Sequence, residues 1–259
     1  MKLSVIKVGG KVVEETATLN TLLDDFKNIV GAKLLVHGGG RSATKLSERL
    51  GIETKMVEGR RITDGETLDV VTMVYAGLVN KNIVAQLQKR NVNAIGLCGA
   101  DLNLIYSAKR PLMNGIDYGF VGDVKEVDTS VLLSLIDQGA VPVVSPITHD
   151  GNGQLLNTNA DTIASELARA LACSNNLEVN LIYCFEKPGV LMNPEDDSTV
   201  IPSMTYDEFQ QYKEEGVVAE GMIPKLDNGF NALRLGVKRV MITNTEGLRN
   251  GRGTLLLLK

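Results

Sequence analysis

The sequence predicts an α/β fold with a mostly parallel central sheet. Short apolar runs of strand length alternate along the chain with patterns of helical period. Most of these runs are almost continuously apolar, which is typical of strands that helices cover on both faces. A chain of 259 residues can bury a large core, either as one domain or as two lobes.

The apolar runs and the helical patterns locate the elements in order along the chain. Strands are predicted at Leu3–Val8, Lys33–His37, Ala94–Cys98, Val141–Ser145, Leu181–Cys184 and Val240–Thr243. Helices are predicted at Thr16–Ile29, Ser42–Leu50, Gly65–Arg90, Thr129–Gln138, Asp161–Ala172, Tyr206–Glu215 and Lys225–Leu235. Three polar, turn-rich stretches are predicted to be hairpins, at Thr54–Thr63, Leu104–Asp128 and Ile147–Asn157. Hairpins that project from such a sheet commonly form a substrate pocket or a lid.

A polar break marks the best boundary between two lobes. Ser174-Asn175-Asn176 follows directly after a predicted helix, and no low-complexity linker or internal repeat occurs elsewhere. We therefore predict an N-terminal lobe at 1–173 and a C-terminal lobe at 174–259.

Composition argues against several classes of protein. The net charge of −4 is modestly negative, which disfavours nucleic acid or a membrane surface as the main partner. The chain starts without a basic segment followed by an apolar one, and no apolar run approaches about 18 residues. We expect a cytoplasmic protein that acts on a small molecule. The three cysteines form no CxxC and are expected to be buried, reduced thiols, and two histidines cannot make a His-rich metal site, so no metal ligands are predicted.

Two glycine turns follow the first two predicted strands. The first reads Lys7-Val8-Gly9-Gly10 and the second His37-Gly38-Gly39-Gly40, and a helical pattern comes after each. Glycines at a strand-to-helix turn let the backbone approach a phosphate closely, and a nearby lysine adds a cation. Neither turn is a P-loop, because the sequence has no G-x-x-x-x-G-K-[ST]. His37 either lines this phosphate site or is a structural histidine at a strand end.

Three further segments carry polar side chains that have both a structural and a chemical interpretation. In Asn157-Thr158-Asn159-Ala160-Asp161, Asn159 can cap the next helix, or the asparagines can bind a ligand while Asp161 orients lysines. In Gly59-Arg60-Arg61-Ile62-Thr63, the arginines are solvated, or one grips a carboxylate. In Gly221-Met222-Ile223-Pro224-Lys225, Lys225 is a surface lysine, or it faces a polyphosphate at a helix start.

The order and spacing of these segments, together with Gly119-Phe120-Val121-Gly122, resemble the N-acetylglutamate kinases of the amino acid kinase family over nearly the whole chain. The resemblance implies a three-layer α/β/α sandwich with a largely parallel sheet. It also implies that the N-terminal lobe binds the acyl amino acid and forms a homodimer, while the C-terminal lobe binds ATP with Mg²⁺. The implied reaction is phosphorylation of the γ-carboxylate of an N-acyl-L-glutamate in arginine biosynthesis.

The resemblance also implies roles for individual residues. The implied catalytic residues are Lys7, Asp161 and Lys225, with Asp161 organising the two lysines. Substrate binding falls to Gly39, Gly40, Arg61 and Asn157, and phosphate or nucleotide binding to Gly9, Gly10, Glu186, Gly189 and Val190. No metal ligand is implied, because Mg²⁺ is held mainly by the nucleotide phosphates.

The chain departs from the family pattern in three places. The segment Thr243-Asn244-Thr245-Glu246-Gly247 is shorter than is usual in the family and lacks a common histidine. Where the family has a Ser/Thr-Asp pair, this sequence reads Phe185-Glu186, so a hydroxyl that contacts the nucleotide is lost. The chain also starts at its first strand, without the N-terminal helix that links dimers of some relatives into arginine-regulated hexamers. We therefore expect a homodimer that is insensitive to arginine.

Alternatives remain for the substrate and for the activity. Acetyl is the default acyl group of the family, and succinyl requires only a changed pocket wall. Another kinase of the family, acting on aspartate, glutamate, carbamate or a nucleoside monophosphate, is the nearest alternative. A catalytically inactive ligand sensor of the same fold is the second.

Overall fold

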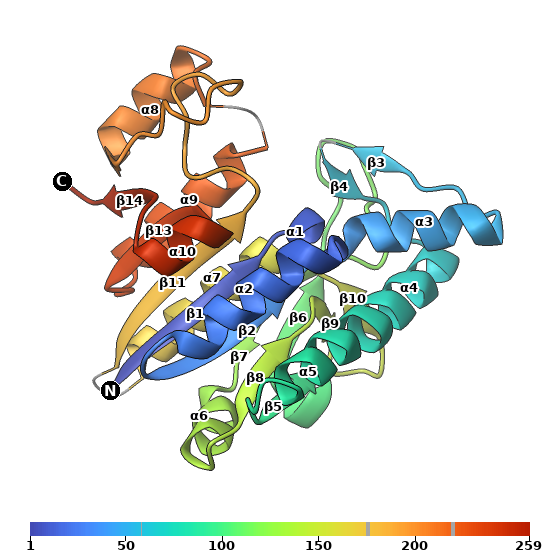
Figure 1. The fold of residues 1–259 in the computed structure, drawn as a ribbon. Coiled ribbons are helices and arrows are strands. Elements are labelled where there is room, and N and C mark those ends of the chain that lie inside the picture. The colour runs from blue at the N-terminus through green and yellow to red at the C-terminus, as the bar shows by residue number, and fades with distance from the viewer. Residues whose placement is uncertain (58, 175–176, 219–220) are drawn as a thin grey trace. The chain divides into compact units, whose positions relative to one another are not determined.

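The computed structural model describes residues 1–57, 59–174, 177–218 and 221–259 (Figure 1). The chain divides into two compact units: unit 1 is Met1–Leu34 with Ala164–Lys259, and unit 2 is Leu35–Ile163. The division falls inside strand β2 (Ala32–His37) and helix α7 (Ala160–Cys173). The sequence predicted two lobes, at 1–173 for the acyl amino acid and at 174–259 for ATP. Because these lobes are defined by the ligands that they bind, their boundary stays a prediction. Asn175 and Asn176 of their boundary lie outside the described residues.

Unit 1 is built on five strands in the order β12-β14-β13-β11-β1. Their bounds are β12 Ser203–Thr205, β14 Thr254–Leu257, β13 Arg239–Asn244, β11 Glu178–Phe185 and β1 Lys2–Val8. Neighbouring strands are parallel except β13 and β14, which are antiparallel. The strands β1 and β11 pair along their full length, from Lys2 opposite Glu178 to Val8 opposite Cys184. Both strands therefore end at the same edge of the sheet.

Helices cover both faces of this sheet. They are α1 Gly10–Glu14, α2 Thr16–Asn28, α8 Tyr206–Glu214, α9 Ile223–Arg234 and α10 Thr245–Asn250, with most of α7. Gly229 of α9 lies against Val240, and Gly247 of α10 lies against Thr243. Successive side chains of a strand point to opposite faces, so α9 and α10 lie on opposite sides of β13. Unit 1 thus has the predicted three layers.

The described strands of unit 2 belong to three different sheets. Its parallel strands are β2, β8 (Val141–Val144) and β5 (Ala94–Leu97). A four-stranded sheet has the order β10-β9-β6-β7, with bounds Leu155–Asn157, Ile147–His149, Ile105–Lys109 and Gly122–Val127. The strands β3 (Met56–Val57) and β4 (Arg60–Arg61) form a separate antiparallel hairpin.

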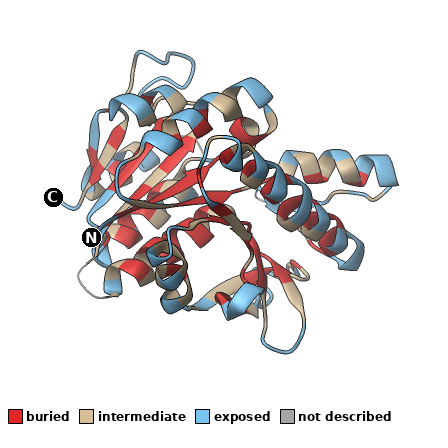
Figure 2. Cartoon of the chain, turned by 60° about the horizontal axis from the view of Figure 1, so that its bottom comes forward, coloured by how far each residue is buried: buried red, intermediate tan, exposed pale blue. Residues whose placement is uncertain are grey.

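The helical elements of unit 2 include one long stretch of mixed type. Its parts are α4 (Gly65–Thr72), a π-helical segment η1 (Met73–Val79) and α5 (Asn80–Gln88). The other helical elements are α3 (Gly40–Leu50), a 3₁₀ turn η2 (Asp101–Asn103) and α6 (Thr129–Asp137). Figure 2 shows buried residues concentrated on the strands, with exposed residues on the outer sides of the helices.

Most of the predicted elements are confirmed. All six strands, the three hairpins and six of the seven helices are present, with ends shifted by up to a few residues. The helix predicted at Gly65–Arg90 is corrected, because the π-helical segment interrupts its α-helical hydrogen bonding. The cysteine prediction is right for Cys184, which is buried. It is wrong for Cys98, which is half-buried, and for Cys173, which is exposed at the end of α7.

The same helical stretch is long and apolar enough to resemble a membrane-crossing helix. An 18-residue window of Gly65–Gln88 reaches a mean hydropathy of 1.2, and 44% of that window is buried inside the protein. The fully buried Asn80 donates through Nδ2 to the Val143 carbonyl oxygen at 2.9 Å, which fixes the helix to β8. This polar anchor and the burial are features of a core helix.

Candidate functional site

The guanidinium of Arg61 is the centre of a buried hydrogen-bond cluster in unit 2. Arg61 is only 9% exposed, whereas its neighbour Arg60 is exposed. Its Nη2 atom donates to the Gly40 carbonyl oxygen at 2.9 Å and to Thr44 Oγ1 at 2.8 Å, and its Nη1 atom donates to Thr54 Oγ1 at 3.2 Å. These bonds join the β3–β4 hairpin to the start of α3. They also identify Arg61 as the arginine that faces inward.

A cavity of about 680 Å³ opens beside this cluster. Its lining includes Gly40, Arg41, Thr44, Glu48, Thr54 and Arg61. The two arginines and two hydroxyl groups in this lining can bind an anionic ligand, since guanidinium groups match carboxylates in geometry and charge. The same lining also carries the carboxylates of Glu48 and Glu53. Thr44 and Thr54 were not predicted as site residues, because nothing in the local sequence around either threonine marks it.

The histidine before the second glycine turn has a structural role. His37 is fully buried, and burial lowers its pKa to about 4, against the Gly38 carbonyl, which raises it. Nδ1 lies 2.8 Å from the Gly38 carbonyl oxygen and Nε2 lies 3.1 Å from Asn80 Nδ2. Because a carbonyl can only accept, Nδ1 carries the proton and Nε2 accepts from the Asn80 amide. Of the two interpretations left open, the structural one therefore describes His37.

Asn157 connects a second strand to the arginine hairpin. Its Nδ2 atom donates to Thr63 Oγ1 at 3.0 Å, and that hydroxyl donates to the Arg61 carbonyl oxygen at 3.2 Å. Asn157 and Thr63 are both buried. The predicted substrate residues Gly40, Arg61 and Asn157 are therefore linked within unit 2 by direct hydrogen bonds and one bridging threonine.

The start of α7 has the predicted cap. Asn159 Oδ1 accepts from the backbone N–H groups of Asp161, at 2.8 Å, and Thr162, at 3.2 Å. The carboxylate of Asp161 is mostly buried in the first turn of α7. Capping thus explains Asn159, whereas the proposed role of Asp161 toward lysines stays a prediction.

In unit 1 the first glycine turn lies at the common end of β1 and β11. Lys7 is buried on β1, and the Gly9 N–H donates to the Cys184 carbonyl oxygen at 2.8 Å. A Cβ on Gly9 would lie 3.2 Å from the Phe185 Cβ, so the absence of a side chain lets the two strand ends approach. Gly10 begins α1 and has open space around it.

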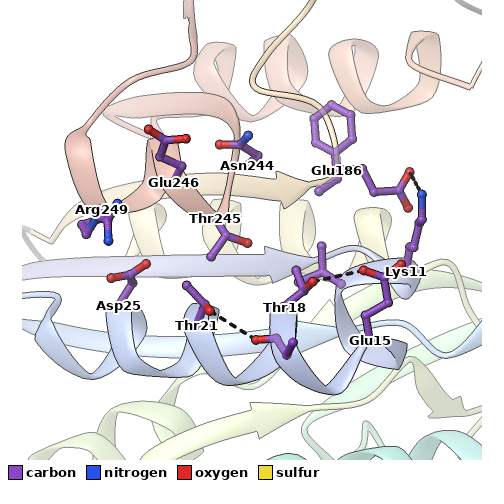
Figure 3. A pocket seen from close by; sticks show the side chains of 13 residues that line it. Lys11, Glu15, Thr18, Thr21, Asp25, Glu186, Asn244, Thr245, Glu246 and Arg249 are labelled. Atoms are coloured by element: carbon purple, nitrogen blue, oxygen red, sulfur yellow. Dashed lines mark hydrogen bonds and ion pairs between the residues drawn. The ribbon is translucent and has the colours of Figure 1, made fainter. Parts of the chain in front are cut away.

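A cavity of about 560 Å³ lies at this sheet edge, between α1, α2 and α10 (Figure 3). Its lining combines Lys11 with four acidic residues and Arg249. The Lys11 Nζ atom lies 3.9 Å from a Glu186 carboxylate oxygen, and Thr18 donates to Glu15 at 3.1 Å. At the other end, burial raises the pKa of Asp25, and the Arg249 charge opposes this rise. Glu186 thus pairs with Lys11 at one end of this pocket, as Figure 3 shows.

The remaining predicted residues also belong to unit 1. The Val190 N–H donates to Thr254 Oγ1 at 2.8 Å, and a Cβ on Gly189 would lie 2.7 Å from the same oxygen. These two residues are therefore packed against β14. Lys225 is half-buried in the first turn of α9, and its Nζ donates to the Gly221 carbonyl oxygen at 3.1 Å.

The predicted site residues thus fall into two groups. Gly39, Gly40, Arg61, Asn157 and Asp161 belong to unit 2, and Lys7, Gly9, Gly10, Glu186, Gly189, Val190 and Lys225 belong to unit 1. Within 1–57, 59–174, 177–218 and 221–259, no group of three or more His, Cys, Asp or Glu side chains is arranged to hold a metal ion.

Comparison with known proteins relates the whole chain to one family. The model of the amino acid kinase family matches residues 2–244. The chain is 62% identical to an acetylglutamate kinase of Bacteroides thetaiotaomicron, covering 98% of this chain and 97% of that protein. It is 41% identical to an acetylglutamate kinase of Methanopyrus kandleri, covering 98% and 100% of the two chains.

Solved structures agree on the fold. The crystal structure of smu.665 from Streptococcus mutans superposes with a TM-score of 0.80 at 26% identity, covering 99% of each chain. Carbamate kinase from Giardia lamblia bound to AMP-PNP superposes with a TM-score of 0.71 at 14% identity, covering 100% and 99% of the two chains. With the family model matching nearly the whole length, this chain belongs to the amino acid kinase family.

Proposed function

We propose that this protein transfers a phosphoryl group from ATP to the γ-carboxylate of N-acetyl-L-glutamate, a step of arginine biosynthesis. The observation that carries the proposal is the sequence identity of 62% and 41% to acetylglutamate kinases of two organisms, over practically the whole of each chain. The buried Arg61 cluster beside a cavity supports it, because the substrate carries carboxylates.

The substrate side of the reaction belongs to unit 2. Arg61 binds the α-carboxylate of the substrate, and Gly39 and Gly40 let the backbone approach it. Bonds to Gly40, Thr44 and Thr54 hold the guanidinium, so a carboxylate meets a cation that is already oriented. Asn157 adds a further substrate contact.

The chemistry needs charge stabilisation and no general base. A glutamate side chain has a pKa of ~4.3, so the attacking γ-carboxylate is ionised at neutral pH. One of its oxygens forms a bond to the γ-phosphorus as the bond from that phosphorus to the β,γ-bridging oxygen breaks, which yields an acyl phosphate and ADP. Lys225 neutralises the nucleotide phosphates and Lys7 the charge near the transferred group, while Asp161 orients the two lysines.

Nucleotide binding falls to Gly9, Gly10 and the segment from Glu186 to Val190. The open space around Gly10 suits close approach of a phosphate, whereas the Gly9 N–H already donates to Cys184. The carboxylate of Glu186 suits a hydroxyl group of the nucleotide better than a phosphate. Mg²⁺ enters with ATP, bound mainly by phosphate oxygens, and supplies charge neutralisation.

A turnover assay with a panel of acceptors tests the function. Hydroxylamine traps acyl phosphates, so incubation with ATP, Mg²⁺ and N-acetyl-L-glutamate should give a hydroxamate. N-succinyl-L-glutamate in the same panel identifies the acyl group. Turnover only with aspartate, glutamate, carbamate or a nucleoside monophosphate would assign another kinase of the family. Tight binding of ligand without any turnover would assign the sensor.

We also propose a cytoplasmic homodimer. The resemblance to the family supports the dimer, and the modest net charge supports a soluble protein that acts on small molecules. Light scattering on the purified protein should give twice the mass of 27.9 kDa. A mass equal to that of one chain would contradict the dimer.

A further inference from the structure

One buried side chain, Tyr75, packs beside the predicted substrate residues of unit 2. Tyr75 is 6% exposed and belongs to the π-helical segment Met73–Val79. π-Helical turns are rare and often occur at functional sites. Tyr75 lies in unit 2 together with Gly39, Gly40 and Arg61.

The ring of Tyr75 packs directly against the glycine turn. A Cβ on Gly39 would lie 2.8 Å from Tyr75 Cδ1, which is closer than Cβ atoms approach other heavy atoms in proteins, and 3.1 Å from Cε1, which is a tight contact. A Cβ on Gly40 would lie 4.0 Å from the Tyr75 hydroxyl oxygen. The ring therefore packs against the backbone of the turn at Gly39, and the hydroxyl group lies near the start of α3.

The hydroxyl group of Tyr75 lies on the side of the Arg61 cluster, because it approaches Gly40, whose carbonyl oxygen accepts from Arg61. Burial raises the pKa of the Tyr75 phenol, while the Arg61 charge and a hydrogen bond from Arg61 oppose that rise. Arg61 in turn donates to the Gly40 carbonyl oxygen at 2.9 Å. Tyr75 and Arg61 thus both contact the glycine turn, from within the same unit.

We propose that Tyr75 is a positioning residue for acyl-glutamate binding, whose ring sets the glycine turn and whose hydroxyl orients the Arg61 guanidinium. This inference rests on the proposed function, because it assigns Tyr75 to the site that binds the substrate carboxylate. A bidentate pair depends on the plane of the guanidinium, so a group that fixes this plane acts on substrate affinity. Tyr75 makes no contact with the transferred phosphoryl group in this scheme and should leave the chemical step unchanged.

The variant Tyr75→Phe tests the hydroxyl group and keeps the ring. Steady-state kinetics should show that KM for N-acetyl-L-glutamate rises about fivefold, while kcat and KM for ATP stay unchanged. The effect is this small because the charged Arg61 guanidinium keeps its other hydrogen bonds. Tyr118→Phe is the matched control: Tyr118 is also buried, at 2% exposed, and its ring lies 5.6 Å from the Arg110 guanidinium carbon. It should leave all constants unchanged.

A double-mutant cycle separates the inference from the proposed function. In the Arg61→Ala background, Tyr75→Phe should add nothing, because its effect acts through Arg61. If Arg61→Ala raises KM and Tyr75→Phe does not, the role of the Tyr75 hydroxyl is wrong and the proposed function stands. If the unaltered protein turns over no acyl-glutamate, the proposed function fails.

The ring contact has its own test. Gly39→Ala places a methyl group against the Tyr75 ring and should raise KM for N-acetyl-L-glutamate at least about tenfold. Tyr75→Leu in the Gly39→Ala background makes room and should recover part of that loss. Full activity of Gly39→Ala, or a double variant weaker than Gly39→Ala alone, would overturn the proposed contact between ring and turn.

Discussion

The Nη2 atom of Arg61 donates a hydrogen bond to the carbonyl oxygen of Gly40 at 2.9 Å, across 21 positions of sequence. This bond joins the β3–β4 hairpin to the glycine turn that precedes α3. Two segments that the sequence analysis assigned to substrate binding are therefore coupled. A change in Arg61 should alter both the charge that meets the substrate and the position of the turn.

Arg61→Ala should raise KM for N-acetyl-L-glutamate about 100-fold and leave KM for ATP nearly unchanged. The magnitude corresponds to about 3 kcal/mol, which is typical of losing charge-assisted hydrogen bonds to a carboxylate. Arg61→Lys should recover little, because an ammonium group cannot reproduce the planar fork. Steady-state kinetics with each substrate varied in turn measure both constants.

Arg60→Ala is the control for this prediction. Arg60 precedes Arg61 in β4 but is exposed, so its loss should leave both constants unchanged. The opposite pattern, with Arg60 essential and Arg61 silent, would show that the carboxylate binds on the other side of the hairpin.

His37 should make the protein less stable in mild acid. Burial lowers the pKa of His37 from 6.5 to about 4, so the unfolded chain binds more protons than the folded one between these values. The free energy of unfolding is therefore not reduced by His37 above about pH 6.5, where the imidazole is neutral in both states. It decreases as the pH falls from 6.5 toward 4, because protonation favours the unfolded chain. Between pH 7.5 and pH 5 the loss should be about 2 kcal/mol.

Urea unfolding at the two pH values measures this effect. In His37→Asn, where the side chain keeps an N–H group that can reach Gly38, the part of the pH dependence due to position 37 should disappear. His149→Gln removes the other histidine and should keep the pH dependence of the unaltered chain. An equal pH dependence in His37→Asn and the unaltered protein would contradict the assignment.

The sequence predicted the site where residue type and order carry the signal. Three short segments indicate their chemistry by their own residues: Lys-x-Gly-Gly, His-Gly-Gly-Gly and the arginine hairpin. Tyr75 gave no such signal, because its partner Gly39 lies 36 positions away and helical periodicity shows which face is buried, not what it meets. Thr44 and Thr54 were not predicted for the same reason, because their partner Arg61 is distant in the sequence.

The fold shows a similar limit. Long elements such as α2 and β1 have enough residues to display a period, and their predictions are confirmed. The helix α1 has only five residues, and the six-residue α10 follows β13 directly, so neither shows a helical pattern. The π-helical segment could not be predicted from the sequence either, because its side chains are as apolar as those of a buried α-helix.

Lys225→Ala should lower kcat by a factor on the order of 10²–10³ and change KM for N-acetyl-L-glutamate far less. This is the typical loss when one preorganised charge contact to a transition state is removed. Lys238→Ala removes an exposed lysine of the same unit and should leave kcat unchanged. Turnover of Lys225→Ala close to that of the unaltered protein would remove Lys225 from the catalytic set.

Phe185 occupies the place where the family resemblance implies a hydroxyl that contacts the nucleotide. It ends β11 opposite Asn244 of β13, and its Cβ lies against Gly9. An apolar side chain cannot donate a hydrogen bond, but backbone N–H groups of the same segment can. We therefore expect this chain to bind ATP through the backbone of its segment from Glu186 to Val190, with a deficit of only ~1 kcal/mol, or about fivefold.

Phe185→Thr should accordingly improve ATP affinity up to about fivefold or leave it unchanged, as measured by isothermal titration calorimetry. Phe185→Leu keeps an apolar side chain without a hydroxyl and should bind ATP like the unaltered protein. If both variants lose affinity strongly, the Phe185 ring itself packs on the nucleotide. If only Phe185→Thr gains affinity, the hydroxyl implied by the family acts at this position, and its absence is a cost specific to this chain.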